Sequence, residues 1–406
     1  MSTLPAVGRL TLRGGPEVEA SLKTLLDEIV HRVSSVVAEE HVRALVLLGG
    51  YGRGEGGVVS EGGEERPHNN LDLLLASRAL DVEGRRETQL KLDAALGPVA
   101  RDARVGIDIS IRDAGAIARD DCRVIWYDAR HGHKTLLGDA GFFKGLKHFT
   151  AERILPSDAL DLLVNRGTLL LINELLLARP GEVDRKPIVR HAAKAVIGYG
   201  DALLFFLGSY HWSYAERQKR MRGRKDVSER FRRLYEAAME FRFSPVDALF
   251  APPDLGEWTA ALRKVLEPVH RRVESLRLGH ELTHWGGYPE KAAARVLFEP
   301  GSPLDLARKV VRLLRGPGPR TGSLLARLGS RAAGPGAVLR AFYPVVAYGA
   351  GNAADRAFVR EALEARSEDR LALVRAYLRA WGRHRDTNLR LSLRRLGLEI
   401  EESAWA

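Results

Sequence analysis

The chain has 406 residues, 45% hydrophobic and 28% charged, so it can bury a sizeable core in two or three domains. Its net charge of +11 favours anionic partners, and the single Cys122 excludes a disulfide framework or a cysteine-based zinc site. No apolar run would span a bilayer and the N-terminal stretch lacks a secretory signal, which predicts a cytoplasmic protein without a membrane partner.

The first predicted element is a helix over residues 16–40, because apolar residues recur there on one helical face. These residues are Leu22, Leu25, Leu26, Ile29, Val30, Val33, Val36 and Val37. A strand over 42–48 follows and ends at the glycine-rich stretch "GGYGRGE" (49–55). Since glycine permits positive φ and convergent backbone N–H groups, this stretch is either a phosphate cradle or only a tight turn. Walker and dinucleotide-binding loops are excluded, because the next predicted element is a strand.

That next strand is "LDLLLA" (71–76), followed by a predicted helix near 83–96 and a strand over 104–113. Apolar residues alternate along the last strand, which places Asp108 on the face opposite to them. Residues 122–139 predict a strand, a polar turn and a short segment that ends at Gly138.

After residue 150 nearly every segment has a helical period, and Gly and Pro interrupt the stretch 298–336. We therefore expect an α+β protein with a small mixed sheet in an N-terminal domain (1–150). A helical domain (151–297) and a connector with C-terminal helices (298–406) complete the predicted organisation.

Three stretches occur in the same order along the chain as the motifs of a known family: "LLGGYGRGE" (47–55), "NNLDLLL" (69–75) and "VGIDISI" (105–111). Together they resemble the nucleotidyltransferase superfamily of the DNA polymerase beta type, and in particular the small bacterial and aminoglycoside nucleotidyltransferases. The resemblance covers about the first 140 residues. It implies a nucleotidyltransferase-like fold for the N-terminal domain.

The resemblance also implies a site. Gly49, Gly50 and Arg53 would contact the triphosphate of a nucleotide, Asp72 would bind Mg²⁺, and Asp108 would be the third acid. The implied reaction transfers a nucleoside monophosphate from a nucleoside triphosphate to a hydroxyl acceptor, which is a small molecule, a protein or an RNA. Magnesium suits carboxylate ligands because it is a hard ion that shares oxygen ligands with phosphates.

Asn70 departs from the family pattern, which has an acid two residues before Asp72. Residues 70 and 72 point to the same face of a strand, so Asn70 stands where a second metal-binding carboxylate is expected. An amide oxygen still coordinates magnesium but brings no charge. The spacer from Tyr51 to Asn69 contains four acids, which either are solvated or fold back as a substitute metal ligand: Glu55, Glu61, Glu64 and Glu65.

Other residues carry weaker signals. His131 and His133 are a metal pair or an exposed turn, and no third ligand has a recognisable spacing. Arg379 and His384 match the Arg-x4-His element of helical ribonuclease domains, or match it by chance in an Arg-rich chain.

The segment 217–235 is strongly basic, and a solvated helix face is the simplest interpretation. The aromatic residues before it are typical of a helix core. If they line a cleft instead, Tyr210, Trp212 and Arg217 are the expected acceptor contacts.

Three hypotheses follow from the sequence. The first is a magnesium-dependent nucleotidyltransferase. The second is a degenerate member of that fold that binds a nucleotide or a partner without turnover. The third is a helical interaction protein whose N-terminal domain is a scaffold.

Overall fold

The computed structural model describes residues 7–246, 250–295, 297–298, 303–315, 319–333, 335–386 and 388–400. The chain divides into two compact units, which we describe separately. Unit 1 comprises Met1–Ala159 and Gly208–Phe250, and unit 2 comprises Leu160–Leu207 and Ala251–Ala406. The expected boundaries at 150 and 297 do not coincide with these units, because a later segment of the chain belongs to unit 1.

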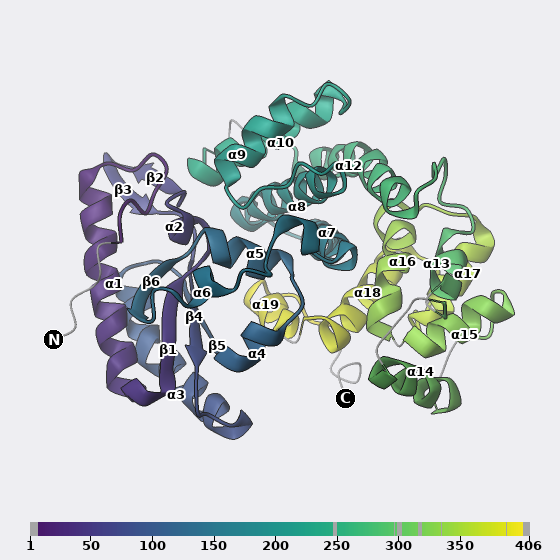
Figure 1. Cartoon of the computed structure of the whole chain (residues 1–406). Coiled ribbons are helices and arrows are strands. Elements are labelled where there is room, and N and C mark those ends of the chain that lie inside the picture. The colour runs from purple at the N-terminus through teal and green to yellow at the C-terminus, as the bar shows by residue number, and fades with distance from the viewer. Residues whose placement is uncertain are drawn as a thin grey trace. The chain divides into compact units, whose positions relative to one another are not determined.

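Unit 1 combines a small sheet with helices, as expected for the N-terminal part of the chain (Figure 1). Its elements are α1 (Pro16–Val36), η1 (Glu39–His41), β1 (Val42–Leu47), α2 (Gly49–Arg53), β2 (Val58–Glu61), β3 (Glu64–Pro67), β4 (Leu71–Ser77), α3 (Val82–Asp102), β5 (Ile107–Asp113), α4 (Ala114–Arg119), α5 (Val124–His131), β6 (Lys134–Gly138), α6 (Phe142–Gly145), η2 (Ala151–Arg153), α9 (Tyr214–Arg222) and α10 (Glu229–Phe243).

The main sheet of unit 1 has the strand order β5-β4-β1-β6. Strand β1 is antiparallel to β4 and β6, whereas β4 and β5 are parallel, so the sheet is mixed as predicted. The strands expected over 42–48, 71–76 and 104–113 all form, and β5 begins three residues later than expected.

One face of this sheet packs against α1 and α3. Leu71, Leu73 and Leu75 of β4 are almost fully buried in a core that includes apolar residues of both helices. The apolar spacing predicted for the first helix is confirmed, since Leu22, Leu26 and others of that set are buried, although α1 ends at Val36 rather than at residue 40. Figure 1 shows α1 running alongside the strands. The opposite sheet face is therefore the one that remains for polar residues.

One local prediction for unit 1 was wrong. Residues 124–131 form helix α5 rather than a strand, and only β6 of the expected extended segments exists. The backbone N–H of Val124 donates to the Asp158 carboxylate at 2.8 Å, and Trp126 stacks on Phe149. These long-range contacts stabilise a helix in a segment whose β-branched and aromatic residues favour a strand.

A β-hairpin also occupies the spacer between the glycine-rich stretch and β4. Strands β2 and β3 pair antiparallel, with Glu61 opposite Glu64 at the turn. The two turn glycines, Gly62 and Gly63, both have positive φ, which glycine adopts without strain. The spacer between α2 and β4 thus contains a folded hairpin.

Unit 2 is helical throughout its described residues, as expected from the sequence. Its helices are α7 (Pro156–Leu177, from Leu160 on), α8 (Arg185–Phe206), α12 (Leu255–Leu278), α13 (Tyr288–Arg295), α14 (Pro303–Arg315), α15 (Leu324–Ala333), α16 (Pro335–Tyr348), α17 (Ala353–Ala362), α18 (Arg370–His384) and α19 (Leu389–Arg395). Short helices α14 and α15 form within the predicted connector, parts of which lie outside the described residues.

A buried polar network holds the centre of unit 2. The Tyr199 hydroxyl lies 2.9 Å from that of Tyr343 and 2.6 Å from that of Tyr348. His270 lies 3.2 Å from the same Tyr348 hydroxyl and is fully buried. Burial and the positive charge of Arg277 lower the pKa of His270 to about 3. The imidazole is therefore neutral in the folded protein near neutral pH.

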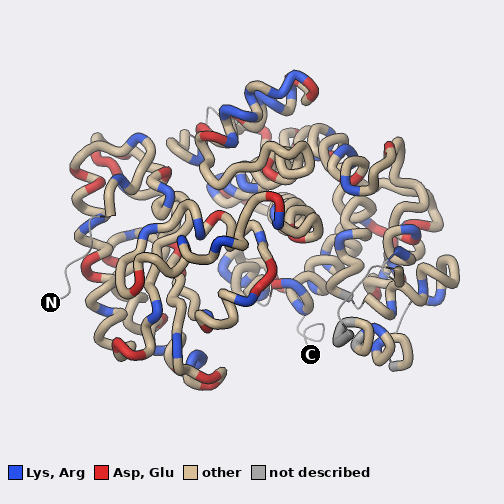
Figure 2. Tube along the Cα trace, viewed as in Figure 1, with Lys and Arg blue, Asp and Glu red and all other residues tan. Residues whose placement is uncertain are grey.

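In the described part of the chain, no helix combines the length and apolar character needed to cross a bilayer. Figure 2 shows basic residues concentrated along α9 and α10. Several of these are paired with acids of the same two helices or of the turn between them, such as Arg220 with Glu216, and Arg222 with Glu236. Their pairing supports the interpretation of the exposed part of this run as a solvated helix surface, whereas Arg217, which begins the run, is buried.

Candidate functional site

Asp72 and Asp108 lie side by side on the open face of the unit 1 sheet. They are Cα partners in the parallel pairing of β4 and β5, and both side chains are exposed. Neighbouring strands are about 4.8 Å apart, so the two carboxylates start from adjacent positions. The structure thus brings together the two acids that the sequence predicted for one site.

Asn70 belongs to the same cluster, but its amide faces Asp108 through nitrogen. Nδ2 of Asn70 donates a hydrogen bond of 2.7 Å to Oδ2 of Asp108. Its oxygen Oδ1 lies over Gly106, 2.5 Å from where a Cβ atom of that residue would be. In this arrangement the amide nitrogen of Asn70, rather than the amide oxygen, faces the carboxylate of Asp108.

The glycine pair predicted as a phosphate cradle begins a short helix, α2, rather than an open loop. Gly49 has a φ of +65°, and a Cβ atom there would collide with Oδ2 of Asp72. A Cβ atom on Gly50 would lie 3.2 Å from Nη2 of Arg242 and 3.2 Å from the carbonyl oxygen of Glu55. Glycine is needed at 49 for its conformation and for the close approach of Asp72, whereas a Cβ atom at 50 would require its neighbours to shift by a few tenths of an ångström.

Tyr51 anchors the glycine turn through a buried side chain. Its side chain is 1% exposed, and its hydroxyl donates to the carbonyl of Gly57 at 2.8 Å. The backbone N–H of Asn69 lies 3.4 Å from the same hydroxyl. Burial raises the pKa of Tyr51 to about 12, so the phenol stays protonated. It ties the turn to the residues just before β4.

Arg53, predicted to contact a nucleotide, is held by Asp128 of α5. Nη2 of Arg53 pairs with Oδ2 of Asp128 at 2.5 Å, and the Arg53 side chain is only 6% exposed. The Tyr210 hydroxyl donates to the same carboxylate at 3.1 Å. Nε and Nη1 of Arg53 are buried and have no hydrogen-bond partner within the described residues.

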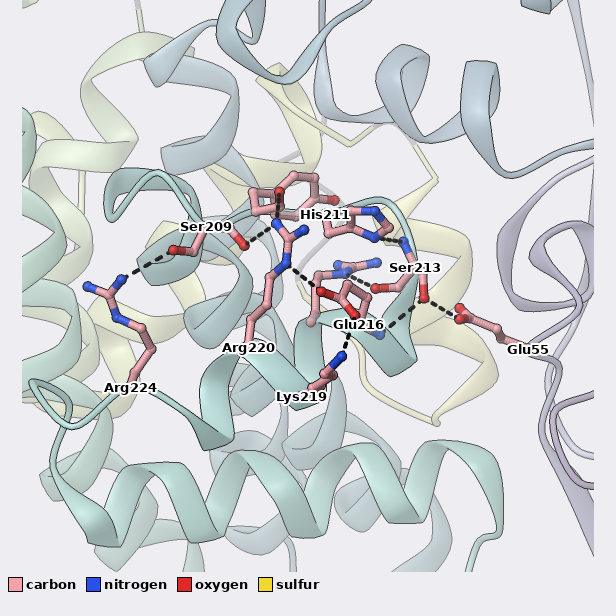
Figure 3. Close-up of polar contacts among 10 residues, drawn as sticks. Glu55, Ser209, His211, Ser213, Glu216, Lys219, Arg220 and Arg224 are labelled. Carbon is pink, nitrogen blue, oxygen red and sulfur yellow. Dashed lines mark hydrogen bonds and ion pairs between the residues drawn. The ribbon is translucent and has the colours of Figure 1, made fainter.

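Glu55 binds the N-terminus of α9 rather than joining the carboxylate pair (Figure 3). Its carboxylate accepts from the Ser213 hydroxyl at 2.5 Å and from the backbone N–H of Tyr214 at 2.7 Å. These bonds satisfy donors that a helix leaves open in its first turn. Glu55 therefore joins the turn after β1 to α9 within unit 1.

The other spacer acids lie on the β2–β3 hairpin. Glu61 pairs with Arg66, and Glu65 accepts from the backbone N–H of Gly15 at 2.6 Å. Glu64 is exposed. Across the described residues, no group of three or more His, Cys, Asp or Glu side chains is arranged to hold a metal ion.

Residues that the sequence analysis missed, or assigned differently, lie next to the glycine turn. Three guanidinium groups surround the ring of Tyr214: those of Arg242 at 3.9 Å, Arg217 at 4.1 Å and Arg53 at 4.4 Å from the ring centroid. Burial acts to raise the pKa of Tyr214, but the three positive charges outweigh it and lower the pKa to about 8. No local sequence pattern joins Arg53 or Arg242 to Tyr214, because both lie far from it in the chain.

The predicted acceptor contacts do not form an open stacking surface. Arg217 is 1% exposed, stacks on Tyr210 as well as Tyr214, and donates to the carbonyl of Trp212 at 3.2 Å. Tyr210 is also buried. These residues form part of the packing around α9, as the helix-core interpretation predicted.

The histidine candidates have local roles. His133 lies 2.6 Å from the carbonyl of Ala129, and His131 packs its ring against Tyr127. In unit 2, Arg379 donates to the carbonyls of Leu363 and Glu364 after α17. Burial raises the pKa of the Cys122 thiol to about 11, which keeps it protonated and a poor nucleophile.

The chemistry of the polar sheet face suits a hard divalent cation. Asp72 and Asp108 offer carboxylate oxygens, and the amide of Asn70 offers a neutral oxygen when it is turned. Turning the amide breaks its hydrogen bond to Asp108, and a cation between the two acids would replace that bond. The donor set therefore fits magnesium, with one negative charge fewer than three acids would give.

The chain matches no protein-family model, and a comparison with curated proteins gives no match.

Proposed function

We propose that unit 1 is a nucleotidyltransferase that transfers a nucleoside monophosphate from a magnesium nucleoside triphosphate to a hydroxyl acceptor. The observation that carries this proposal is the alignment of Asp72 with Asp108 on neighbouring strands, directly beside the turn that begins at Gly49. Two exposed acids next to a glycine-rich turn combine cation and phosphate binding in one place.

In this proposal Asp72 and Asp108 hold magnesium, and Asn70 completes the set with its amide oxygen. Magnesium, when bound, neutralises charge on the phosphates and the leaving group. The acceptor hydroxyl oxygen attacks the α-phosphorus, and the bond from this phosphorus to the pyrophosphate oxygen breaks. Asp108 takes the hydroxyl proton, so the products are the nucleotidylated acceptor and pyrophosphate.

A second candidate function is nucleotide binding without turnover. The hydrogen bond from Asn70 to Asp108 favours binding without turnover, because the carboxylate that would accept the proton of the acceptor hydroxyl already accepts this bond. A site with two carboxylates also binds magnesium more weakly than a site with three. Nucleotide binding is common to both candidates, and pyrophosphate release distinguishes them.

The test is calorimetry with each of the four nucleoside triphosphates, with and without magnesium, followed by an assay for pyrophosphate release. We expect magnesium-dependent binding that Asp72→Asn weakens at least about tenfold, since removing one charged ligand costs at least about 1.4 kcal/mol. Asp27→Asn, which changes an exposed acid on α1, is the matched control. No binding of any triphosphate at millimolar concentration would refute both candidate functions.

A further inference from the structure

Arg53, Arg217 and Arg242, which we call the arginine cluster, surround Tyr214 beside the glycine turn. They come from α2, α9 and α10, all in unit 1. Their Cζ atoms lie between 3.9 and 4.4 Å from the Tyr214 ring centroid. Like charges this close repel one another, so the cluster is stable only where other interactions compensate.

Within the described residues, some of the hydrogen-bond donors of these arginines have no partner. Asp128 pairs with Nη2 of Arg53, but Nε and Nη1 of Arg53 and Nε of Arg242 are buried without a hydrogen-bond partner. A buried charged donor without a hydrogen-bond partner destabilises the folded protein, because it has lost its water and gained nothing in exchange. These unsatisfied donors are what an oxyanion would bind.

The cluster also lies where an anion would meet the candidate cation site. Nη2 of Arg242 is 3.2 Å from the position of a Cβ atom on Gly50, while the carboxylate of Asp72 lies against Gly49. Consecutive glycines of one turn therefore face a positive and a negative side chain. A ligand with phosphates and a bound cation matches this distribution of charge.

We propose that the arginine cluster binds the polyphosphate of the nucleotide, and that Arg242 contacts the phosphate next to Gly50. This inference rests on the proposed function, because it assigns the polyphosphate end of the same ligand. Guanidinium groups bind phosphate oxygens through two parallel hydrogen bonds, which suits a ligand with several charged oxygens. Arg217 is a positioning residue, because it is buried and bonded to the Trp212 carbonyl.

Tyr214 reports on the charge of the cluster. Its phenol is lowered to a pKa of about 8 despite burial, because Arg242, Arg53 and Arg217 favour the phenolate, while Asp128 opposes them. Glu55 also faces this residue through the Tyr214 backbone N–H. A bound polyphosphate offsets the arginine charges, so it raises the pKa of Tyr214. This shift is observable in the ultraviolet absorbance of the phenolate.

The experiment is calorimetry of the full chain with sodium tripolyphosphate in the absence of magnesium. We expect binding that Arg242→Gln weakens at least tenfold. Arg233→Gln is the matched control, since Arg233 is an exposed arginine on the same helix that pairs with Glu229, and it should change the affinity less than twofold. Equal effects of the two substitutions would overturn the inference.

Two further measurements keep the test decisive. If Arg242→Gln does not fold, Arg242→Lys keeps the charge but loses the paired donors, and we expect it to weaken binding about threefold or more. In wild type, a phenol should titrate near pH 8 and move upward with tripolyphosphate, and Tyr214→Phe should remove this transition. A transition unmoved by bound tripolyphosphate would contradict binding at the cluster.

The outcomes separate this inference from the proposed function. Binding of magnesium triphosphates that is unchanged in Arg242→Gln would overturn the inference alone. Binding of tripolyphosphate through Arg242, with no magnesium-dependent binding of nucleotide, would overturn the proposed function alone and point to inorganic polyphosphate. No binding of either ligand by wild type would overturn both.

Discussion

Asn70, the residue before β4, donates a hydrogen bond of 2.7 Å to Asp108 of the neighbouring strand β5. An asparagine at this position therefore does more than remove a negative charge, because its amide is also hydrogen-bonded to the neighbouring carboxylate of Asp108. The bond gives the carboxylate of Asp108 a hydrogen-bond donor in the absence of a cation. It also predicts how the face responds when the amide is replaced by an acid.

Asn70→Asp should increase magnesium affinity at least tenfold and lower stability without magnesium. The new carboxylate loses the bond to Asp108 and repels it, and a bound cation relieves this repulsion. Thermal unfolding and calorimetry across a magnesium series measure both effects. The double variant Asn70→Asp with Asp108→Asn keeps the number of acids constant and is the control. An Asn70→Asp protein whose stability does not depend on magnesium would exclude a cation site here.

Gly49→Ala should destabilise unit 1 by more than the cost of its backbone conformation. Left-handed φ costs a non-glycine residue roughly 1–2 kcal/mol, and here the Cβ atom also displaces Asp72. Gly62→Ala isolates the first cost, because Gly62 has a φ of +63° and open space around it. Urea unfolding of the two variants gives the difference. If both lose the same free energy, the contact between Gly49 and Asp72 is unimportant.

Gly50→Val should abolish nucleotide binding in a folded protein. Its side chain would press on Arg242 and on the carbonyl of Glu55, both 3.2 Å from the Cβ position. Calorimetry with magnesium triphosphate measures the loss, and circular dichroism verifies the fold. Unaltered nucleotide affinity in the folded variant would argue against a phosphate site at this turn.

Glu55→Gln should lower stability without changing magnesium affinity. The carboxylate bonds Ser213 and the first backbone N–H groups of α9, and a charged hydrogen bond is worth about 1.5–3 kcal/mol. Thermal unfolding and magnesium calorimetry test the two halves of this prediction. Glu64→Gln, on the exposed hairpin, controls for loss of an acid. Magnesium binding that is weaker in Glu55→Gln but not in Glu64→Gln would support Glu55 as a substitute metal ligand.

Stability should fall as the pH decreases from about 6.5 toward 3, because His270 has its pKa lowered to about 3 when folded. In this range the unfolded chain binds a proton that folded His270 does not, and His191, with its pKa also lowered to about 3, adds a second proton. Each contributes a slope of about 1.4 kcal/mol per pH unit. Urea unfolding of His270→Phe at several pH values should give a slope smaller by one proton.

The exposed His31 on α1 provides the comparison for that series. His31→Gln removes a histidine without touching the buried network of unit 2, and its unfolding is compared with that of His270→Phe at each pH. A slope that His270→Phe leaves unchanged would mean that His270 takes up its proton in the folded protein.

The strands that carry the candidate site were predictable from sequence, and the groups around them were not. Alternation of apolar residues identified the strand of Asp108, and the family resemblance paired that acid with Asp72. Helix α5 was mistaken for a strand, because Asp158, which bonds its first turn, lies beyond the reach of local periodicity. The positions of Arg242 and Tyr214 beside the site were not predicted for the same reason. Only the folded chain brings Arg242 close to Gly50 and to the ring of Tyr214.

Unit 1 is discontinuous in sequence, since Gly208–Phe250 joins residues that precede Leu160. During synthesis, the partners of Glu55 and Arg53 on α9 emerge from the ribosome only after the first helices of unit 2. A fragment that ends at Ala159 would expose the Glu55 carboxylate and leave Arg53 without Tyr214 and Arg217. Studies of the candidate site should therefore use the full chain, since removal of Gly208–Phe250 would take Arg217 and Arg242 away from the glycine turn.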